Sequence, residues 1–308
     1  MQCLVLGGGG FIGSAICDQL LSNGYGVNVF EHYKTKPYRN FLESENIKWF
    51  SGDFHSLDQD IECLDGVETI IHLISTTHPS TSNKDPIFDI ESNLINTVKL
   101  LSKLEKSSVK RVIFISSGGT VYGEPTYLPI DEKHPTNPIV SYGIVKLAIE
   151  KYLLMYCKLF NIKPIILRVS NPYGERQQIG SMQGAIGVFL NKAINDQPIE
   201  IWGDGLICRD YIHVRDVAKS VIKAIKYSGN ASIFNISSGS GVTLTDLALA
   251  IEKALGRKIT VNYLEQRSFD VKSNILCNKL AKTELLWQPE IAIEDGIKST
   301  MAWVVGSN

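Results

Sequence analysis

Residues 2–13 decide the fold, and they read Gln2-Cys3-Leu4-Val5-Leu6-Gly7-Gly8-Gly9-Gly10-Phe11-Ile12-Gly13. The apolar run fits a buried strand, and a helical pattern begins at Phe11 after the four glycines. Such a turn lets backbone N–H groups and a helix N-terminus meet a pyrophosphate, because side chains would block the approach. The spacing fits two registers, one using Gly7, Gly10 and Gly13 and the other Gly8, Gly10 and Gly13. We expect Gly7, Gly10, Phe11, Ile12 and Gly13 to contact a dinucleotide.

An acidic residue follows this turn at the end of the predicted second strand. Glu31 stands about twenty residues after the glycines, where an acid binds the hydroxyls of an adenosine ribose. A carboxylate there disfavours a 2′-phosphate, which predicts NAD rather than NADP as the cofactor. Lys34 and Lys36 follow closely, and their positive charges would instead favour the 2′-phosphate of NADP.

The first half of the chain alternates short apolar runs with longer helical patterns, which is typical of a parallel sheet covered by helices. After Val169, loops rich in Gly, Asn and Pro separate the helical segments. We therefore predict an α/β protein, with a Rossmann-like doubly wound parallel sheet in residues 1–170 and a smaller, interleaved C-terminal α/β substrate lobe in residues 171–308. The predicted strands are Gln2–Leu6, Val27–Phe30, Lys48–Phe50, Thr69–Leu73, Arg111–Ser116 and Pro164–Val169; helices are expected to start near Phe11, before Leu57, around Asp85 and near Ser141, and to span Val188–Asp196, Val214–Tyr227, Thr245–Leu255 and Ile293–Val304.

The composition indicates a small-molecule partner. The 308 residues carry a net charge of −1 with mixed signs throughout, so no basic cluster marks a nucleic-acid or membrane surface. Six cysteines lie scattered without a Cys-x-x-Cys pair or a histidine cluster, which predicts neither a metal site nor a disulfide framework. The N-terminus enters a strand directly and lacks the pattern of a signal peptide. We expect a cytoplasmic protein.

A possible proton-transfer pair lies at Tyr142-Gly-Ile-Val-Lys146. Residues four apart share one face of a helix, so the Lys146 ammonium can approach the Tyr142 phenol. A free tyrosine has a pKa near ~10, and bringing it to working pH requires ~4 kcal/mol of stabilisation of the phenolate. One nearby lysine and a cationic nicotinamide ring could supply it.

Four further stretches extend the pattern. Gly52-Asp53 follows the third predicted strand, and Ser116-Ser-Gly-Gly-Thr-Val-Tyr-Gly123 follows the fifth. Later come Arg168-Val-Ser-Asn-Pro-Tyr-Gly174 and Gly203-Asp-Gly-x-x-x-Arg-Asp-Tyr-Ile-His-Val214. With the glycine turn and the Tyr-Lys pair, the chain closely resembles the extended short-chain dehydrogenase/reductase family, in particular nucleotide-sugar 4-epimerases of the UDP-galactose 4-epimerase type. The resemblance runs nearly end to end.

The resemblance implies cofactor contacts in the first half. Asp53 would touch the adenine, and Asn93 would support the fourth helix and the cofactor, although the glycine usual three residues later is Asn96 here. The full set of implied NAD contacts beyond the glycine turn is Glu31, Asp53, Phe54, Leu73, Asn93, Ser116, Tyr142, Lys146 and Tyr173.

It also implies a UDP-sugar or other nucleotide-sugar substrate. Asn171 would touch the substrate phosphate, and Arg209 and Arg267, the latter followed by Asp270, would bind the diphosphate. Two guanidiniums suit a diphosphate because each offers a planar fork of donors. Asn274 stands where the family gates the size of the sugar pocket, and an Asn of intermediate size favours an N-acetylhexosamine.

The chain departs from the family at its third catalytic position. Gly118 stands where a Ser or Thr normally binds the sugar hydroxyl, so Ser117, Thr120 or a water would have to supply that contact. Family members that dehydrate or decarboxylate the sugar carry acidic residues in this loop, where this chain has Gly119 and Thr120. The difference favours epimerisation or simple ketone chemistry, with Tyr142, Lys146, Ser117 and Thr120 as the catalytic candidates.

The predicted function is therefore NAD-dependent inversion of C4 in a UDP-hexose or UDP-N-acetylhexosamine, in surface polysaccharide synthesis. The alternatives are an NAD(P)-dependent 4-keto-sugar-nucleotide reductase or dehydrogenase, and a non-catalytic relative that binds a nucleotide sugar. By family analogy we expect a homodimer formed through the helices around Leu94–Leu104 and Ile144–Leu159. The tryptophans, including Trp202, are expected to pack in the core or between lobes.

Overall fold

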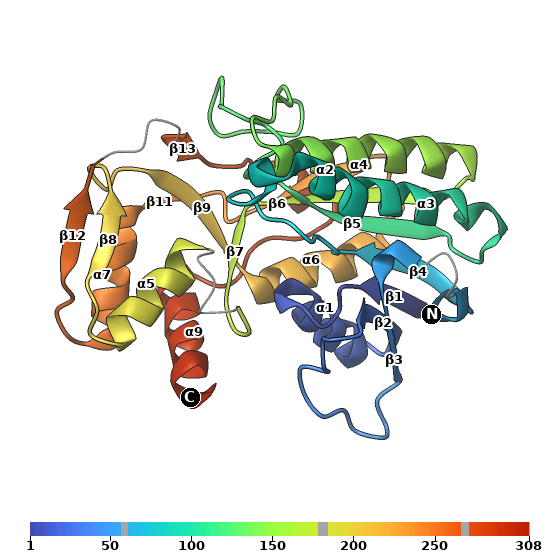
Figure 1. Cartoon of the computed structure of the whole chain (residues 1–308), viewed down its shortest axis with the longest axis horizontal. Coiled ribbons are helices and arrows are strands. Elements are labelled where there is room, and N and C mark those ends of the chain that lie inside the picture. The colour runs from blue at the N-terminus through green and yellow to red at the C-terminus, as the bar shows by residue number, and fades with distance from the viewer. Residues whose placement is uncertain (57–60, 178–183, 266–270, 308) are drawn as a thin grey trace.

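A parallel seven-stranded sheet forms the main layer of the computed structural model, which describes residues 1–56, 61–177, 184–265 and 271–307 (Figure 1). The strand order is β10-β6-β5-β4-β1-β2-β3, so the order reverses between β1 and β4, where open sheets of this kind bind their ligands. Six of the strands lie where the sequence predicts them. The strands are β1 (Gln2–Leu6), β2 (Gly26–His32), β3 (Ile47–Gly52), β4 (Val67–His72), β5 (Arg111–Ser117), β6 (Lys163–Val169) and β10 (Ile233–Ile236).

Helices cover both faces of this sheet, which confirms the doubly wound fold. On one face α1 (Phe11–Ser22) packs against α6 (Val214–Lys226). On the other face lie α2 (Pro86–Asp89), a π-helical turn at Ile90–Ile95, α3 (Asn96–Ser102) and α4 (Ser141–Leu159). Val5 belongs to the apolar cluster of the first face and Leu4 to that of the second. A strand that is buried on both faces has a continuous apolar sequence, as β1 does.

A smaller lobe stands beside the sheet, at the left of Figure 1. Its strand β9 pairs with β7, β11 and β13, and β8 pairs with β12. None of these short strands is predicted by the sequence analysis. The helices and strands of this lobe are β7 (Asn171–Tyr173), α5 (Ala185–Ile194), β8 (Ile199–Trp202), β9 (Cys208–His213), β11 (Gly241–Thr243), α7 (Leu244–Leu255), β12 (Val261–Leu264), β13 (Ser273–Asn274) and α9 (Ile293–Ser307). Helix α8 (Lys279–Glu284) packs against β10 of the main sheet.

The structure differs from the sequence-based prediction around residues 54–64. The described residues around the expected helix before Leu57 form only the short 3-10 turns Phe54–Ser56 and Ile61–Leu64. After residue 170 the chain returns to the main sheet through α6 and β10, so the division into 1–170 and 171–308 stays a proposal about interleaved units. Within the described part of the chain, no helix has the length and apolar composition needed to cross a bilayer.

Candidate functional site

A cleft of about 550 Å³ opens at the carboxyl ends of β1, β4 and β5. The glycine turn forms one wall, since Gly7, Gly9, Gly10, Phe11, Ile12 and Gly13 all line it. Leu73, Ser116, Ser117, Tyr142 and Lys146 also line it. The structure thus brings most of the predicted cofactor residues and three of the four catalytic candidates into one cavity.

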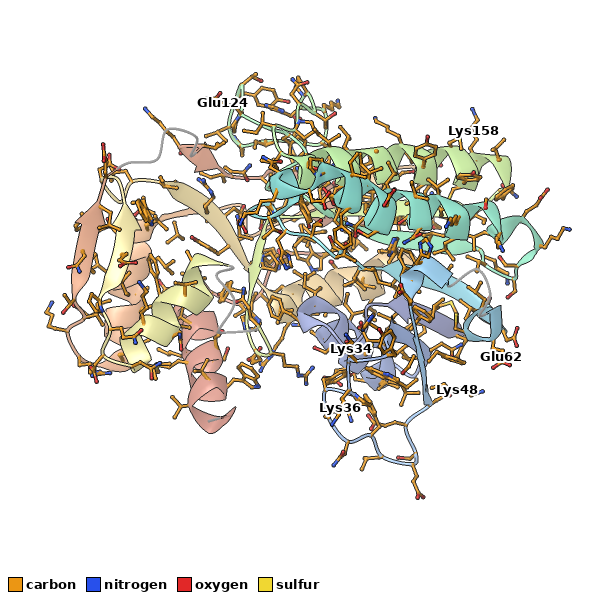
Figure 2. All side chains as sticks on the ribbon, in the orientation of Figure 1. Lys34, Lys36, Lys48, Glu62, Glu124 and Lys158 are labelled. Carbon is orange, nitrogen blue, oxygen red and sulfur yellow. The ribbon has the colours of Figure 1, made fainter. Side chains whose placement is uncertain are left out.

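The glycine turn is packed too closely for side chains. Gly7 has a φ of +88°, and a Cβ on Gly13 would lie 2.0 Å from the Gly7 carbonyl oxygen. Glu31 ends β2 beside this turn, where its Oε2 accepts a 2.9 Å hydrogen bond from the Gly9 N–H. A backbone cradle at a helix N-terminus with an adjacent carboxylate fits the pyrophosphate and ribose of NAD. Lys34 and Lys36 lie on the exposed loop that follows β2 (Figure 2).

Helix α4 places the proton-transfer pair in the cleft. The Lys146 Nζ donates a 3.2 Å hydrogen bond to the Ile115 carbonyl and lies 5.6 Å from the centre of the Tyr142 ring. Burial lowers the pKa of Lys146 to about 8, although the charges of Asp89 and Glu150 oppose the change. The ammonium is therefore still largely protonated at neutral pH.

The Tyr142 phenol is shifted in the opposite direction. Burial raises its pKa to about 12, a hydrogen bond with the Ser75 side chain lowers it, and the Asp89 carboxylate raises it. The phenol is therefore protonated in the free protein, and a cation must come close to it before it can act as a base near neutral pH.

The loop after β5 explains the glycine at the third catalytic position. A Cβ on Gly118 would lie 2.3 Å from the Leu276 Cδ1, so the side chain of Leu276 fills the space that a serine would need. Ser117 lines the cleft beside it. Thr120 does not line the cleft, and its buried Oγ1 has no hydrogen-bond partner among the described residues.

Four further cofactor candidates, Ser116, Asn93, Asp53 and Phe54, differ in where they lie relative to this cavity. The Ser116 hydroxyl donates to the buried Glu150 carboxylate over 2.5 Å and so points toward α4. The Asn93 Oδ1 accepts a 2.9 Å hydrogen bond from the Thr76 N–H, which fixes the loop after β4. Asp53 and Phe54 are outside the cavity wall, and the Asp53 carboxylate accepts from the His55 N–H over 2.9 Å.

A second hollow of about 490 Å³ lies in the smaller lobe. It shares Pro172 and Gln177 with the cofactor cleft, so the two cavities adjoin. The predicted substrate residues Asn171 and Arg209 form part of its wall, and so does Tyr173, which the sequence analysis expects at the cofactor. The predicted residues Arg267 and Asp270 lie outside the described part of the chain.

Trp202 and Asn274, two other residues of the smaller lobe, differ in how far their side chains are exposed. Trp202 lines the hollow and is 37% exposed, whereas the sequence analysis expected it to pack internally. Its position directly before the Gly203 motif is the signal that could have indicated a ligand contact. Asn274 is 3% exposed, its Nδ2 donates to the Gly118 carbonyl over 3.5 Å, and its Oδ1 has no partner among the described residues.

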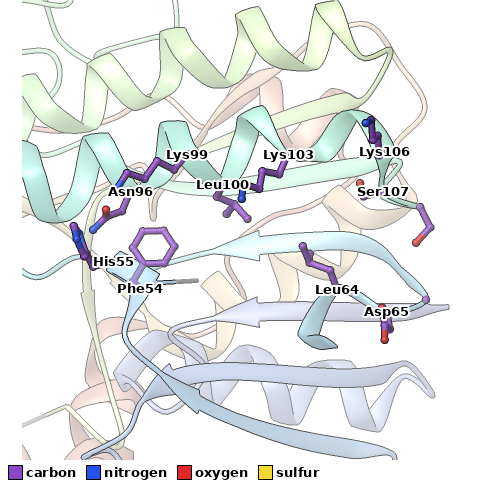
Figure 3. A pocket seen from close by; sticks show the side chains of 12 residues that line it. Phe54, His55, Leu64, Asp65, Asn96, Lys99, Leu100, Lys103, Lys106 and Ser107 are labelled. Atoms are coloured by element: carbon purple, nitrogen blue, oxygen red, sulfur yellow. The ribbon is translucent and has the colours of Figure 1, made fainter. Parts of the chain in front are cut away.

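A third hollow of about 270 Å³ lies between α3 and the turn before β4 (Figure 3). Phe54 and Leu100 contribute apolar surface to it, and Lys99, Lys103 and Lys106 lie along its rim. Among the described residues it shares no wall with the cleft that holds Tyr142.

Comparison with known proteins agrees with this geometry. The model of a family described as the NAD dependent epimerase/dehydratase family matches residues 3–237. A dTDP-4-dehydro-6-deoxyglucose reductase of Escherichia coli is 36% identical over 96% of this chain and 94% of its own length. A UDP-glucose 4-epimerase of Mycolicibacterium smegmatis is 33% identical over 98% and 97%. The crystal structure of UDP-glucose 4-epimerase from Thermotoga maritima with UDP-glucose has a TM-score of 0.93 and 32% identity, covering 100% of this chain and 99% of that one.

Proposed function

Because this chain belongs to the NAD-dependent epimerase/dehydratase family, we propose that it inverts C4 of a UDP-hexose or UDP-N-acetylhexosamine through a 4-keto intermediate. One observation carries the proposal. Tyr142 and Lys146 line the cofactor cleft, and that cleft adjoins the hollow of the smaller lobe at Pro172 and Gln177. A sugar nucleotide bound in the hollow would place its hexose beside the phenol.

The residues of the cleft would hold the cofactor of this family. The backbone of the glycine turn would bind the pyrophosphate, and Glu31 would bind the adenosine ribose. When bound there, NAD would supply the hydride acceptor and donor for the sugar carbon. A carboxylate at position 31 disfavours the additional phosphate of NADP.

Tyr142 would move the proton. It would remove the proton from the C4 hydroxyl and return it to the C4 oxygen after the sugar has turned and the hydride has added to the opposite face. The Lys146 ammonium favours the phenolate, because an opposite charge at this distance lowers the pKa of an acid. This charge has to overcome the burial that raises the pKa of Tyr142.

The smaller lobe would hold the diphosphate tightly and the sugar loosely. Arg209 and Asn171 lie in the wall of the hollow, where a guanidinium and an amide can bind phosphate oxygens. Trp202 adds an aromatic face to the same wall, which suits a nucleobase. The sugar would then be free to rotate about its tether between the two hydride transfers.

We further propose an N-acetylhexosamine as the preferred sugar. Asn274, the residue at the position that limits the size of the sugar pocket, donates a hydrogen bond to the Gly118 carbonyl. Both residues are smaller than the aromatic side chains that would restrict the pocket.

A reductase is the second candidate, and the 36% identity with the Escherichia coli dTDP-4-dehydro-6-deoxyglucose reductase supports it. Such an enzyme would use the same Tyr142 and Lys146 but release a reduced sugar. The two functions differ in cofactor consumption, because an epimerase regenerates NAD within each cycle.

The test is incubation of the purified protein with UDP-GlcNAc and with UDP-glucose, without added reductant, followed by NMR of the C4 centre. We expect inversion of at least one sugar, faster for UDP-GlcNAc, and a loss of at least about a hundredfold in Tyr142→Phe. Consumption of NADH with a 4-keto sugar nucleotide, and no inversion of either sugar, would establish the reductase instead.

A further inference from the structure

The turn that follows β7, residues 174–177, carries an arginine that the sequence analysis does not single out. We propose that Arg176 retains the dinucleotide, because it closes the cofactor cleft beside the glycine turn while its side chain is anchored to α1 and to the loop after β2. The inference rests on the proposed function, since an epimerase regenerates its NAD within each cycle and does not need to release it.

Arg176 lies where the cofactor cleft meets the hollow of the smaller lobe. It lines the cleft together with Gly10, Phe11 and Ile12, which belong to the turn expected to hold the pyrophosphate. The next residue, Gln177, lines both the cleft and the hollow. A dinucleotide bound to the glycine turn would therefore be enclosed on one side by Arg176, at the border with the substrate.

Two side chains from a distant part of the chain anchor the guanidinium of Arg176. An Nη2 of Arg176 lies 2.8 Å from the Oδ2 of Asp18 in α1, and the guanidinium carbon lies 4.5 Å from the centre of the Tyr38 ring. The Tyr38 hydroxyl donates to the Asp18 Oδ1 over 3.0 Å, so the two anchoring groups also hold each other. The side chains of Arg176 and Asp18 are each 32% exposed, and water screens such a pair less than a pair at the open surface.

The backbone of Arg176 indicates that these contacts hold the turn in place. Its φ is +66°, in the left-handed region that residues other than glycine seldom adopt. Such a conformation costs free energy and persists where the surrounding contacts stabilise it. The preceding residue, Glu175, pairs with Arg215 of α6 over 2.6 Å. Successive residues of the turn are thus attached to α6 and to α1, which keeps Arg176 in the wall of the cleft.

The experiment measures the rate at which NADH leaves the protein, followed by NADH fluorescence after mixing with excess NAD. In Arg176→Gly, which removes the side chain and suits the left-handed backbone, we expect release to be about tenfold faster, because an ion pair and a ring contact are lost. Asp18→Asn removes only the charge of the anchor and should also accelerate release. Arg257→Gly is the matched control, since Arg257 pairs with Asp196 in the smaller lobe and lines neither cavity. Circular dichroism melting would establish that each variant folds.

The variants separate retention by an anchored turn from direct binding of phosphate by Arg176. Unchanged release in Arg176→Gly, or equal acceleration in Arg257→Gly, would overturn the retaining role even if the wild type inverts sugars. Unchanged or slower release in Asp18→Asn would overturn it as well, because the guanidinium would then act without its anchor. Faster release in Arg176→Gly and Asp18→Asn, with a wild type that turns over no sugar nucleotide, would instead uphold the role of Arg176 and overturn the proposed function.

Discussion

At the scale of single residues, the site holds a buried lysine whose charge is costly to the free protein. Lys146 is 4% exposed, and its pKa falls from 10.5 to about 8 on burial. Between these two pH values the unfolded state binds more protons than the folded state, so the free energy of unfolding rises as pH increases through this range. The shift corresponds to a cost of roughly 3 kcal/mol at neutral pH.

We therefore expect Lys146→Met to raise the free energy of unfolding of the nucleotide-free protein at pH 7, even though it abolishes activity. The rise in stability between pH 8 and pH 10.5 should also become smaller in the variant. Denaturant unfolding at a series of pH values measures both effects. A variant less stable than the wild type at pH 7 would contradict a net cost of burying the ammonium.

The contact between Gly118 and Leu276 makes a second residue-scale prediction. Gly118→Ser should destabilise the fold by about 1–3 kcal/mol, because the new Cβ collides with a well-packed leucine. Combined with Leu276→Ala, the serine should cost less than it does alone. A double-mutant cycle measures this coupling, and additive effects would contradict the proposed collision.

At the scale of elements, the sequence predicts the parts that depend on local pattern. Six strands of the main sheet contain short apolar runs, and α4 and α6 carry helical periodicity, so their positions follow from the chain alone. The seventh strand, β10, is not predicted. Strands β7, β9, β11 and β13 are short and exist through pairing with one another, which no local pattern reveals.

The same distinction applies to the site. The glycine turn, Glu31 and the Tyr142–Lys146 pair are local motifs and lie close to one another as predicted. Leu276 limits Gly118 from a distant part of the chain, and Ser75 and Tyr142 line the same cleft only through tertiary packing.

The buried Asp89 carboxylate accepts hydrogen bonds from Thr77, in the loop after β4, and from Ser141, at the start of α4. Asp89→Ala would leave the hydroxyls of Thr77 and Ser141 without their acceptor in a buried place, at a cost of about 3–5 kcal/mol. Amide hydrogen exchange should become faster in the loop after β4 and in the first turn of α4, while β2 and β3 remain protected. Uniform loss of protection across the sheet would contradict a local scaffold.

At the scale of the whole molecule, one apolar surface lacks a covering element among the described residues. Along α4 the side chains of Ile144, Tyr152, Met155 and Leu159 are exposed, the last of them by 67%. Exposed apolar residues also lie on the neighbouring helical segment, namely Ile87, Phe88, Ile90 and Ile95. An apolar surface of this size marks an interaction site, and we propose that a second copy of the chain covers it in a homodimer.

Charges on this surface should separate the copies. We expect the double variant Met155→Glu with Leu159→Glu to be a monomer, because two carboxylates would be buried at the interface. Leu249→Glu, on an exposed position of α7 in the smaller lobe, is the matched control and should remain dimeric. Light scattering coupled to size-exclusion chromatography gives the mass of each. A dimeric double variant would place the dimer interface elsewhere, and a monomeric wild type would contradict the proposed homodimer.

The central claim for the whole molecule is that the hydrogen removed from C4 of the sugar returns to the same carbon on its other face. The most direct measurement supplies UDP-GlcNAc and UDP-glucose with deuterium at C4 and follows the label by NMR and mass spectrometry. This account predicts an inverted sugar that retains its deuterium at C4, with none formed by Tyr142→Phe. Inversion with loss of the label to solvent, or no inversion of either sugar, would contradict it.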